Sequence, residues 1–118
     1  MYLGEVCIMT RDVQRLAAFY KALLQVDNGS DDCIHQTILA QEPMLTILHD
    51  ELPVNACQTM CMALTVVDID AAYAHAQAIG AEIAAPPSRR PWGTVNMVLR
   101  DPDGNLVYLR QQGKKQDT

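Results

Sequence analysis

Asp101-Pro102-Asp103-Gly104-Asn105 is a turn-forming stretch between two apolar runs near the end of the chain. Asp, Pro, Gly and Asn favour tight turns, each for its own backbone reason. The flanking runs, residues 95–99 and 106–110, alternate apolar side chains in the manner of β-strands. A third strand-like run, residues 82–84, follows Gly80, which is a typical residue for ending a helix. This part of the sequence therefore predicts a helix followed by three consecutive strands.

A strand and a helix N-terminus precede that segment, and the same order begins the chain. Residues 60–67 predict a strand, and Asp68 or Asp70 follows as the N-cap of a helix with apolar residues at helical spacing. Residues 5–9 and Asp12 repeat this order in the first half. The simplest account of the chain is one unit that occurs twice.

Two strand-like runs follow the first predicted helix, at residues 33–39 and 44–48. Pro43 marks the turn between them, and Ser30-Asp31-Asp32 before them is a polar loop. The first half therefore contains the same kinds of element as the second.

The composition agrees with a single globular domain. The 118 residues carry a net charge of −5, with 49% hydrophobic and 19% charged residues, which is typical of folded chains. We expect a single α+β domain over residues 1–118. It contains two strand–helix–strand–strand–strand (βαβββ) modules, at residues 3–52 and 58–111, and a polar tail at 112–118.

Charge and hydropathy exclude several classes of partner. A pI near 4.9 leaves no broad basic surface for nucleic acid, and no apolar run approaches the roughly 20 residues that span a bilayer. The N-terminus lacks the basic start and apolar stretch of a secretory signal. We therefore expect a cytoplasmic protein with four reduced cysteines and no nucleic-acid or membrane partner.

Alternation within the predicted strands separates two faces of each sheet. Val107 and Leu109 share one face of the last strand, and Tyr108 and Arg110 point to the other. A wholly apolar face suits packing under a helix, and a mixed face suits the wall of a ligand cavity. A half-solvated antiparallel sheet accounts for the same alternation.

The motifs occur in an order that points to a known family. Arg90-Pro91-Trp92-Gly93, the turn at residues 101–105 and Tyr108 follow two helices expected at residues 12–24 and 67–80. In this order they resemble the glyoxalase, bleomycin-resistance and extradiol-dioxygenase superfamily, also called the vicinal oxygen chelate superfamily. The resemblance implies paired βαβββ modules whose sheets curl around a central cleft, which dimerisation commonly completes.

Metal-dependent members of that superfamily place a His, Glu or Gln ligand on the first and last strand of each module. The resemblance puts Glu5 and Cys61 at the first-strand positions. It puts Tyr108 on the last strand of the second module and Ile47, or a direct neighbour, on that of the first. Catalytic divalent metals take three or four imidazole and carboxylate ligands, and only Glu5 is an ordinary ligand here. We therefore expect no metal cofactor.

A small set of residues is expected to bind a ligand at the cleft: Glu5, His35, Cys61, Trp92, Asn96 and Tyr108. Tyr108 combines a flat apolar ring with a hydroxyl, which suits an aromatic or amphiphilic ligand. His35 points either into the cleft or to solvent. Arg89 and Arg90 could draw an anionic ligand to the mouth of the cleft, or simply be solvated.

Several of these residues have structural alternatives. Glu5 is either a ligand-binding carboxylate or base, or a surface residue at a strand end. Trp92 either contacts the ligand or anchors its loop over the core. Asn96, if buried, needs a hydrogen-bond partner from the ligand or a neighbouring strand. Cys7 and Cys61 share a predicted face, so either could be a thiol that lines the pocket. Of the two readings, the sequence favours buried, inert thiols.

Three functions fit these observations. The first is a metal-free homodimer that binds a small aromatic or amphiphilic molecule, similar to bleomycin-resistance proteins. The second is a lyase, isomerase or dioxygenase of the glyoxalase type, with an unusual metal site or with Glu5 as the base. The third is an interaction or structural dimer. The sequence favours the first and leaves open whether the chain is an enzyme.

Overall fold

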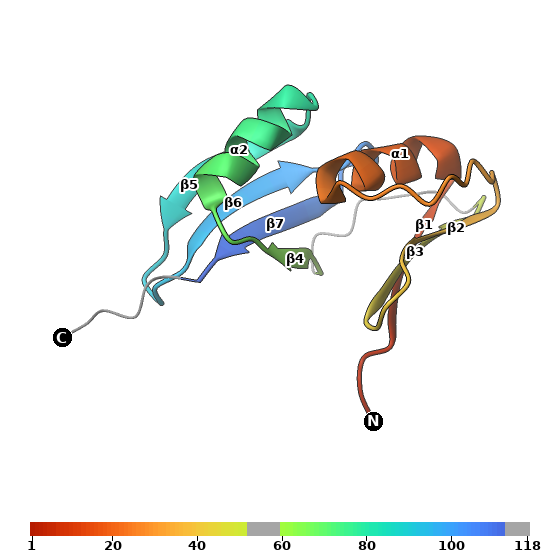
Figure 1. Ribbon diagram of the computed structural model, residues 1–118, viewed down its shortest axis with the longest axis horizontal. Coiled ribbons are helices and arrows are strands. Elements are labelled where there is room, and N and C mark those ends of the chain that lie inside the picture. The colour runs from red at the N-terminus through yellow and green to blue at the C-terminus, as the bar shows by residue number, and fades with distance from the viewer. Residues whose placement is uncertain (52–59, 113–118) are drawn as a thin grey trace. The chain divides into compact units, whose positions relative to one another are not determined.

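A computed structural model describes residues 1–51 and 60–112 of the chain. The chain divides into two compact units, Met1–Asn55 and Ala56–Thr118, and each unit holds one helix and one sheet (Figure 1). Cys57 and residues 113–118 of the tail expected at 112–118 lie outside the described residues. In the described part of the chain, neither helix is long and apolar enough to cross a membrane.

The first unit is a three-stranded mixed sheet with one helix against it. Its strands are β1 (Glu5–Thr10), β2 (His35–Leu39) and β3 (Met44–His49), and its helix is α1 (Val13–Leu24). The strand order is β1-β3-β2, with β1 parallel to β3 and β2 antiparallel to it. The first and last strands of the unit are therefore neighbours, and β1 lies at an edge of the sheet.

Helix α1 begins and ends at residues suited to those positions. Asp12 is the N-cap, as the sequence predicts, because its carboxylate accepts a hydrogen bond from the Arg15 N–H at 3.1 Å. At the other end Gln25 adopts a left-handed conformation, and its N–H donates to the Lys21 carbonyl. The helix buries one apolar side, formed by Val13, Leu16, Ala17, Tyr20 and Leu23.

The segment between α1 and β2 is a polar loop without a strand. The first unit therefore has three strands within the described residues, where a βαβββ module has four. Side chains in this loop bind backbone N–H groups that a strand would pair with its neighbour. The Asp32 carboxylate accepts from Ile34 N–H at 2.7 Å and from His35 N–H at 3.0 Å. The strand expected from Cys33 consequently begins at His35.

These hydrogen bonds also act on the acidity of Asp32. The bond from the His35 N–H, and after it the bond from the Ile34 N–H, lower the pKa of Asp32 below its usual value. Both bonds stabilise the charged carboxylate, so the start of β2 is held by an ionised side chain.

The second unit is a four-stranded mixed sheet with one helix against it. Its elements are β4 (Met62–Thr65), α2 (Ile69–Ala78), β5 (Glu82–Arg89), β6 (Val95–Arg100) and β7 (Leu106–Gln111). The strand order is β4-β7-β6-β5, with β4 parallel to β7 and the other pairs antiparallel. The predicted α+β class is confirmed, and the order of elements in this unit is βαβββ.

Two boundaries of the second unit differ from the sequence expectation. The strand expected at residues 60–67 is limited to β4, which has four residues. The strand expected at residues 82–84 continues as β5 through Pro86 and Pro87. Proline is tolerated there because β5 is an edge strand, where a missing N–H need not cost a ladder hydrogen bond.

Helix α2 is capped by Asp68, which settles the choice between Asp68 and Asp70. The Asp68 carboxylate accepts a hydrogen bond from the Asp70 N–H at 3.0 Å. The side-chain carbonyl of Gln111, on β7, accepts another from the Ile69 N–H at 2.6 Å. Gly80, with φ of 75°, follows the helix in the left-handed conformation that ends many helices.

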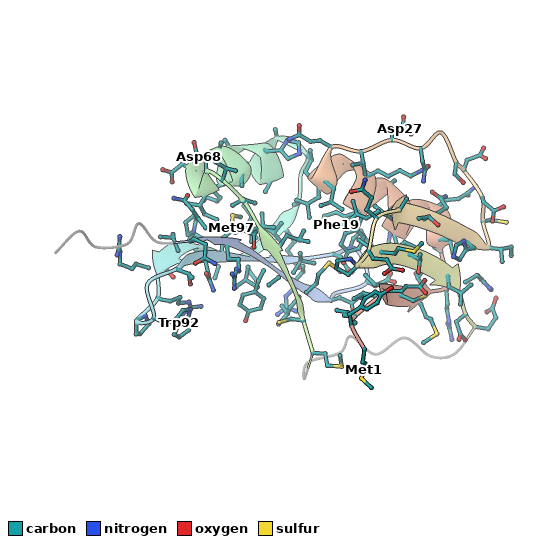
Figure 2. The ribbon with its side chains drawn as sticks, turned by 60° about the horizontal axis from the view of Figure 1, so that its bottom comes forward. Met1, Phe19, Asp27, Asp68, Trp92 and Met97 are labelled. Atoms are coloured by element: carbon teal, nitrogen blue, oxygen red, sulfur yellow. The ribbon has the colours of Figure 1, made fainter. Side chains whose placement is uncertain are left out.

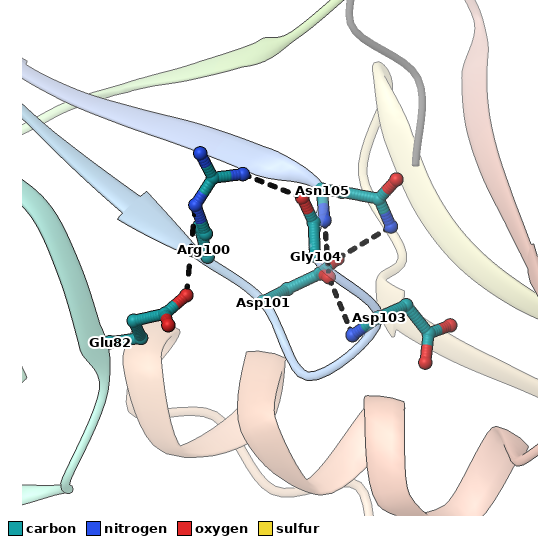
Figure 3. Close-up of polar contacts among 6 residues, drawn as sticks. All are labelled: Glu82, Arg100, Asp101, Asp103, Gly104 and Asn105. Atoms are coloured by element: carbon teal, nitrogen blue, oxygen red, sulfur yellow. Dashed lines mark hydrogen bonds and ion pairs between the residues drawn. The ribbon is translucent and has the colours of Figure 1, made fainter. Parts of the chain in front are cut away.

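The turn between β6 and β7 is organised by the carboxylate of Asp101 (Figure 3). Asp101 Oδ1 accepts hydrogen bonds from the backbone N–H groups of Asp103 and Asn105, both at 2.9 Å. Its Oδ2 accepts from Asn105 Nδ2, also at 2.9 Å. Asp101 is 4% exposed, and Gly104 supplies the positive φ, 86°, that the turn requires. The side chain of Asp101 therefore holds this turn in place.

Each helix covers one face of its own sheet, and Figure 1 shows α2 lying across β5, β6 and β7. Beneath α2 the sheet buries Met97, Leu99, Val107 and Leu109. The first sheet likewise buries Ile38, Leu45 and Ile47. These are the apolar faces that alternation predicts, and the mixed faces lie opposite the helices.

Candidate functional site

Each sheet has a face that no described helix or strand of its own unit covers. The first open face carries Glu5, Cys7, Met9, His35, Thr37, Met44, Thr46 and Leu48. The second open face carries Ala63, Thr65, Ser88, Asn96, Val98, Arg100, Tyr108 and Arg110. Strand pairing places these side chains in rows across each sheet, because paired residues point to the same side.

Glu5 lies on the first open face, and within the described residues its carboxylate has one hydrogen-bond partner. The hydroxyl of Thr46 donates to Glu5 Oε2 at 2.6 Å. Thr46 is 1% exposed, whereas Glu5, on the edge strand β1, is exposed. The carboxylate is thus positioned by a buried hydroxyl and stays accessible to solvent or to a ligand.

His35 belongs to the same face but to a different part of it. It pairs with Leu48, which in turn pairs with Met9. This row is two rows away from the one that contains Glu5 and Met44, and His35 lies on the opposite edge strand. The structure therefore does not bring Glu5 and His35 together.

Thr46 is the first-unit counterpart of Tyr108. Thr46 pairs with Cys7 on β1, and Tyr108 pairs with Ala63 on β4. Cys7 and Ala63 stand at the same distance along the chain before their N-cap aspartates. Ile47 is 0% exposed and belongs to the helix-covered face. The expected position is met by the direct neighbour of Ile47, because a shift of one residue moves a side chain to the other face.

The second open face brings Tyr108 and Asn96 close together. Tyr108 pairs with Val98, and Arg110, in the next row, pairs with Asn96. Tyr108 and Asn96 therefore occupy neighbouring strands one row apart. Cys61 immediately precedes β4 and is exposed.

Trp92 lies at the tip of the hairpin that joins β5 to β6, as Figure 2 shows. It is 70% exposed, which contradicts the alternative in which this residue anchors its loop over the core. The guanidinium carbon of Arg90 is 6.0 Å from the centre of the Trp92 ring, within the range of a cation–π contact. The indole is thus presented to solvent or to a ligand with a cation beside it.

Polar atoms at the hairpin end of the second open face are buried without a hydrogen-bond partner among residues 1–51 and 60–112. They are Arg90 Nε, Thr94 Oγ1, Asn96 Oδ1 and Arg110 Nε. Within the part of the chain that the structure describes, neither arginine forms an ion pair. Buried polar atoms usually have partners, so this concentration on one face indicates a surface suited to a polar group from another molecule.

Sequence reasoning missed two members of this group, Thr94 and Arg110. Alternation assigned Arg110 to the mixed face of its strand. What the sequence could not show is which acids lie near it, because its neighbours on the sheet come from other strands. The useful signal was that Arg110 alternates with Tyr108 on a strand whose other face is apolar.

The expectation that Cys7 and Cys61 are buried is wrong. Cys7, Cys33 and Cys61 are free thiols, and all three are exposed. Cys7 lies on the first open face and Cys61 precedes an edge strand, so in neither case does the helix of the same unit cover the thiol.

The side chains at the four family positions do not fit a catalytic metal. They offer one carboxylate from Glu5, a thiol from Cys61, a phenol from Tyr108 and a hydroxyl from Thr46. Catalytic divalent metals bind three or four imidazole or carboxylate ligands. Nor does any group of three or more His, Cys, Asp or Glu side chains within residues 1–51 and 60–112 have an arrangement that could hold a metal ion.

Comparison with known proteins gives one family. The sequence matches the family model of the Glyoxalase/Bleomycin resistance protein/Dioxygenase superfamily over residues 2–109. No curated protein matches the chain significantly.

Solved structures of that description share the fold. A glyoxalase/bleomycin resistance protein/dioxygenase family enzyme from Burkholderia phytofirmans PsJN is 18% identical, with a TM-score of 0.78 over 94% of this chain and 98% of that one. A glyoxalase/bleomycin resistance protein/dioxygenase from Nocardioides is 19% identical, with a TM-score of 0.78 over 97% of this chain and 85% of that one. A glyoxalase/bleomycin resistance protein from Albidiferax ferrireducens T118 is 21% identical, with a TM-score of 0.76 over 92% and 97%. At these identities the likeness shows the fold alone.

Proposed function

Because the chain belongs to the Glyoxalase/Bleomycin resistance protein/Dioxygenase superfamily, we propose that it binds a small aromatic or amphiphilic molecule on its open sheet faces. Binding takes place in a homodimer and without the metal that glyoxalase-type chemistry requires. The protein then acts in the manner of a bleomycin-resistance protein, which holds its ligand without altering it.

The observation that carries this proposal is the character of the second open face. Tyr108 and Trp92 offer aromatic surface there. The unpartnered atoms of Asn96 and Arg110 offer hydrogen bonds beside Tyr108. Small-molecule sites combine apolar or aromatic surface with polar groups at fixed positions, and this otherwise polar face offers both around Tyr108.

The proposed dimer is supported by the edge strand β1. Val6 is 38% exposed and Met9 is 52% exposed on this strand, and one side of β1 has no strand to pair with in its own sheet. Exposed apolar edges favour pairing with another chain. Sedimentation velocity at micromolar concentration tests this part of the proposal, which expects a dimer and is contradicted by a monomer.

Metal content is the first test of the binding proposal. Untagged protein is supplemented with nickel, zinc, iron and manganese, freed of unbound metal, and subjected to elemental analysis. We expect far less than one metal ion per chain. A near-stoichiometric metal that is lost in Glu5→Gln, but retained in Glu51→Gln, would contradict the proposal. Glu51 is a matched control, since it is an exposed glutamate of the same unit that pairs with His49.

Ligand binding is the second test. A thermal-shift screen of neutral and anionic aromatic compounds and of antibiotics is expected to give saturable stabilisation by at least one compound. A protein that is dimeric but binds none of them would favour the interaction or structural role instead.

An enzyme that uses Glu5 is the second candidate function. The observation in its favour is the Thr46 hydroxyl bound to an accessible carboxylate on an open face. A ligand found in the screen is incubated with the protein and recovered. Unchanged ligand supports a binding protein, and product formation that is lost in Glu5→Gln supports the enzyme.

A further inference from the structure

Arg100 and Arg110 lie on the second open face and Arg90 lies at its hairpin end, and these arginines differ in their partners. Arg100 has Glu82, whose Oε2 lies 3.7 Å from Arg100 Nε (Figure 3). Its Nη1 also donates to the Gly104 carbonyl at 3.3 Å. Arg110 and Arg90, at the hairpin end, have no such partner in the described residues. Glu82 is therefore already paired with Arg100, at the end of the face away from the hairpin.

The unpartnered groups follow one another along the strand register. Asn96 pairs with Arg110 on one side and with Ser88 on the other. Thr94 and Arg90 lie next to this row, and the Arg90 N–H donates to the Thr94 carbonyl at 2.7 Å. Arg90 and Arg110 are thus two strands apart, which is about 10 Å, and two residues apart along them, which is about 7 Å. Two long side chains at this separation can reach a single group that lies over Asn96.

The chemistry of the unpartnered atoms specifies that group. Both Nε atoms are donors with a full positive charge behind them, and a guanidinium binds a planar carboxylate through two parallel hydrogen bonds. Asn96 Oδ1 is an acceptor and needs a donor, such as a hydroxyl next to the carboxylate. Thr94 can donate or accept. Contact between Arg90 and the Trp92 ring leaves the in-plane N–H groups of the guanidinium free.

From these observations we propose that the ligand is an aromatic acid with a neighbouring hydroxyl group. Its carboxylate binds Arg110 and Arg90 at the hairpin end of the second open face. Its hydroxyl donates to Asn96, and its ring lies against Tyr108 or Trp92. This inference rests on the proposed function, since it names the class of molecule that the same face binds.

The test follows the Nε–Hε signals of the arginines by NMR in the full chain. The probe is 1-hydroxy-2-naphthoate, and the matched neutral probe is 1-hydroxy-2-naphthamide. We expect saturable shifts at Arg90 and Arg110, none at Arg100, and at least about tenfold weaker binding of the amide. Inorganic phosphate at the same ionic strength is expected to give no saturation in this range.

Variants assign the effect to Arg110. Arg110→Gln is expected to weaken naphthoate binding about tenfold or more and to leave the affinity for the amide unchanged. Arg100→Gln, on the same face but paired with Glu82, is expected to keep the full affinity. If Arg110→Gln does not fold, Arg110→Lys is measured instead. It keeps the charge, loses the two-pronged geometry, and is expected to bind more weakly than the unmodified chain.

Three results would overturn the inference: no saturable shift with the naphthoate, equal binding of acid and amide, or equal saturation by phosphate. Equal binding of acid and amide would leave the proposed function standing, because a neutral aromatic ligand would then be bound. If no aromatic compound binds, in this titration or in the thermal-shift screen, both the inference and the proposed function are contradicted.

Discussion

The two open faces come from the same arrangement of strands and differ in how their polar groups are satisfied. In both units the first strand runs parallel to the last, and a helix covers the other side of the sheet. On the first face Glu5 has the hydroxyl of Thr46 as its partner. On the second face, polar atoms of Asn96, Arg110 and their neighbours have no hydrogen-bond partner among the residues that the structure describes. The repeated fold sets the face to which each side chain points. The residue type at each position decides whether the polar atoms on that face find hydrogen-bond partners within the unit.

The largest expected effect comes from removing the Asp101 carboxylate, which holds the turn between two strands of the second sheet. Asp101→Ala takes away the acceptor of three hydrogen bonds in the turn that joins β6 to β7. We expect the free energy of unfolding to fall by about 3 kcal/mol, since donors near a buried side chain lose their partner. Urea denaturation measures this loss. Asp31→Ala, at an exposed loop position, is the control and is expected to change stability by less than about 0.5 kcal/mol.

A second change tests whether the polar groups of the second face are truly unsatisfied. Thr94→Val removes a hydroxyl whose oxygen is buried without a partner, on a residue that is 8% exposed. We expect stability without ligand to rise by about 1 kcal/mol, because the cost of burying that hydroxyl disappears. A destabilised variant in urea denaturation would mean that Thr94 has a partner in solution.

The matching change on the first face is expected to have the opposite sign. Thr46→Val removes the donor to Glu5, and stability is expected to fall by about 0.5–1 kcal/mol, since Glu5 is exposed and can turn to water. Thr46→Ser keeps the hydroxyl and is expected to restore most of the loss. If Thr46→Val and Thr94→Val shifted the urea midpoint in the same direction, the contrast between the faces would be wrong.

The smallest expected effect concerns pH and the polar loop of the first unit. The pKa of Asp32 is lowered from 3.8 by hydrogen bonds from the N–H groups of His35 and Ile34. Because the folded pKa is the lower one, this stabilisation is present above the unfolded pKa. It is lost as the pH falls below about 4, through the folded value. Asp32→Asn keeps an acceptor but not the charge. We expect its urea midpoint to fall less than that of the unmodified chain between pH 5 and pH 3.

Much of the fold could be predicted because local rules act on single strands and helices. Asp12 caps its helix, the Asp101 turn forms where its residues favour it, and Val107 and Leu109 face α2. The strand-like runs of the first half match its three strands, but the repeat implied a fourth strand that the first unit does not have within the described residues, since its polar loop binds its own backbone. Nor could alternation distinguish Thr46 from Ile47, because register depends on the partner strand.

The candidate site could be predicted only in part. Tyr108 and Asn96 were identified from their positions, and the structure places them on one face. Arg110 was not identified, because its importance lies in a buried Nε atom that has no hydrogen-bond partner in the described part of the chain, which only the structure reveals. Cys7 and Cys61 were expected inside since thiols are usually buried, but they lie where no helix of their own unit covers them.

The pairing of first and last strands also bears on how the chain is made. β1 is synthesised first in its unit and pairs with β3, which is synthesised last. In the second unit, β4 is likewise synthesised first and pairs with β7, the last strand. On the ribosome, neither sheet can close until its final strand has emerged, and closure over such a separation is slow. During that interval the apolar residues of β1, including Val6 and Met9, have no strand beside them. Exposed strand edges favour misassembly, so we expect the growing chain to be most prone to it before residue 49 of the first unit and residue 111 of the second have left the tunnel.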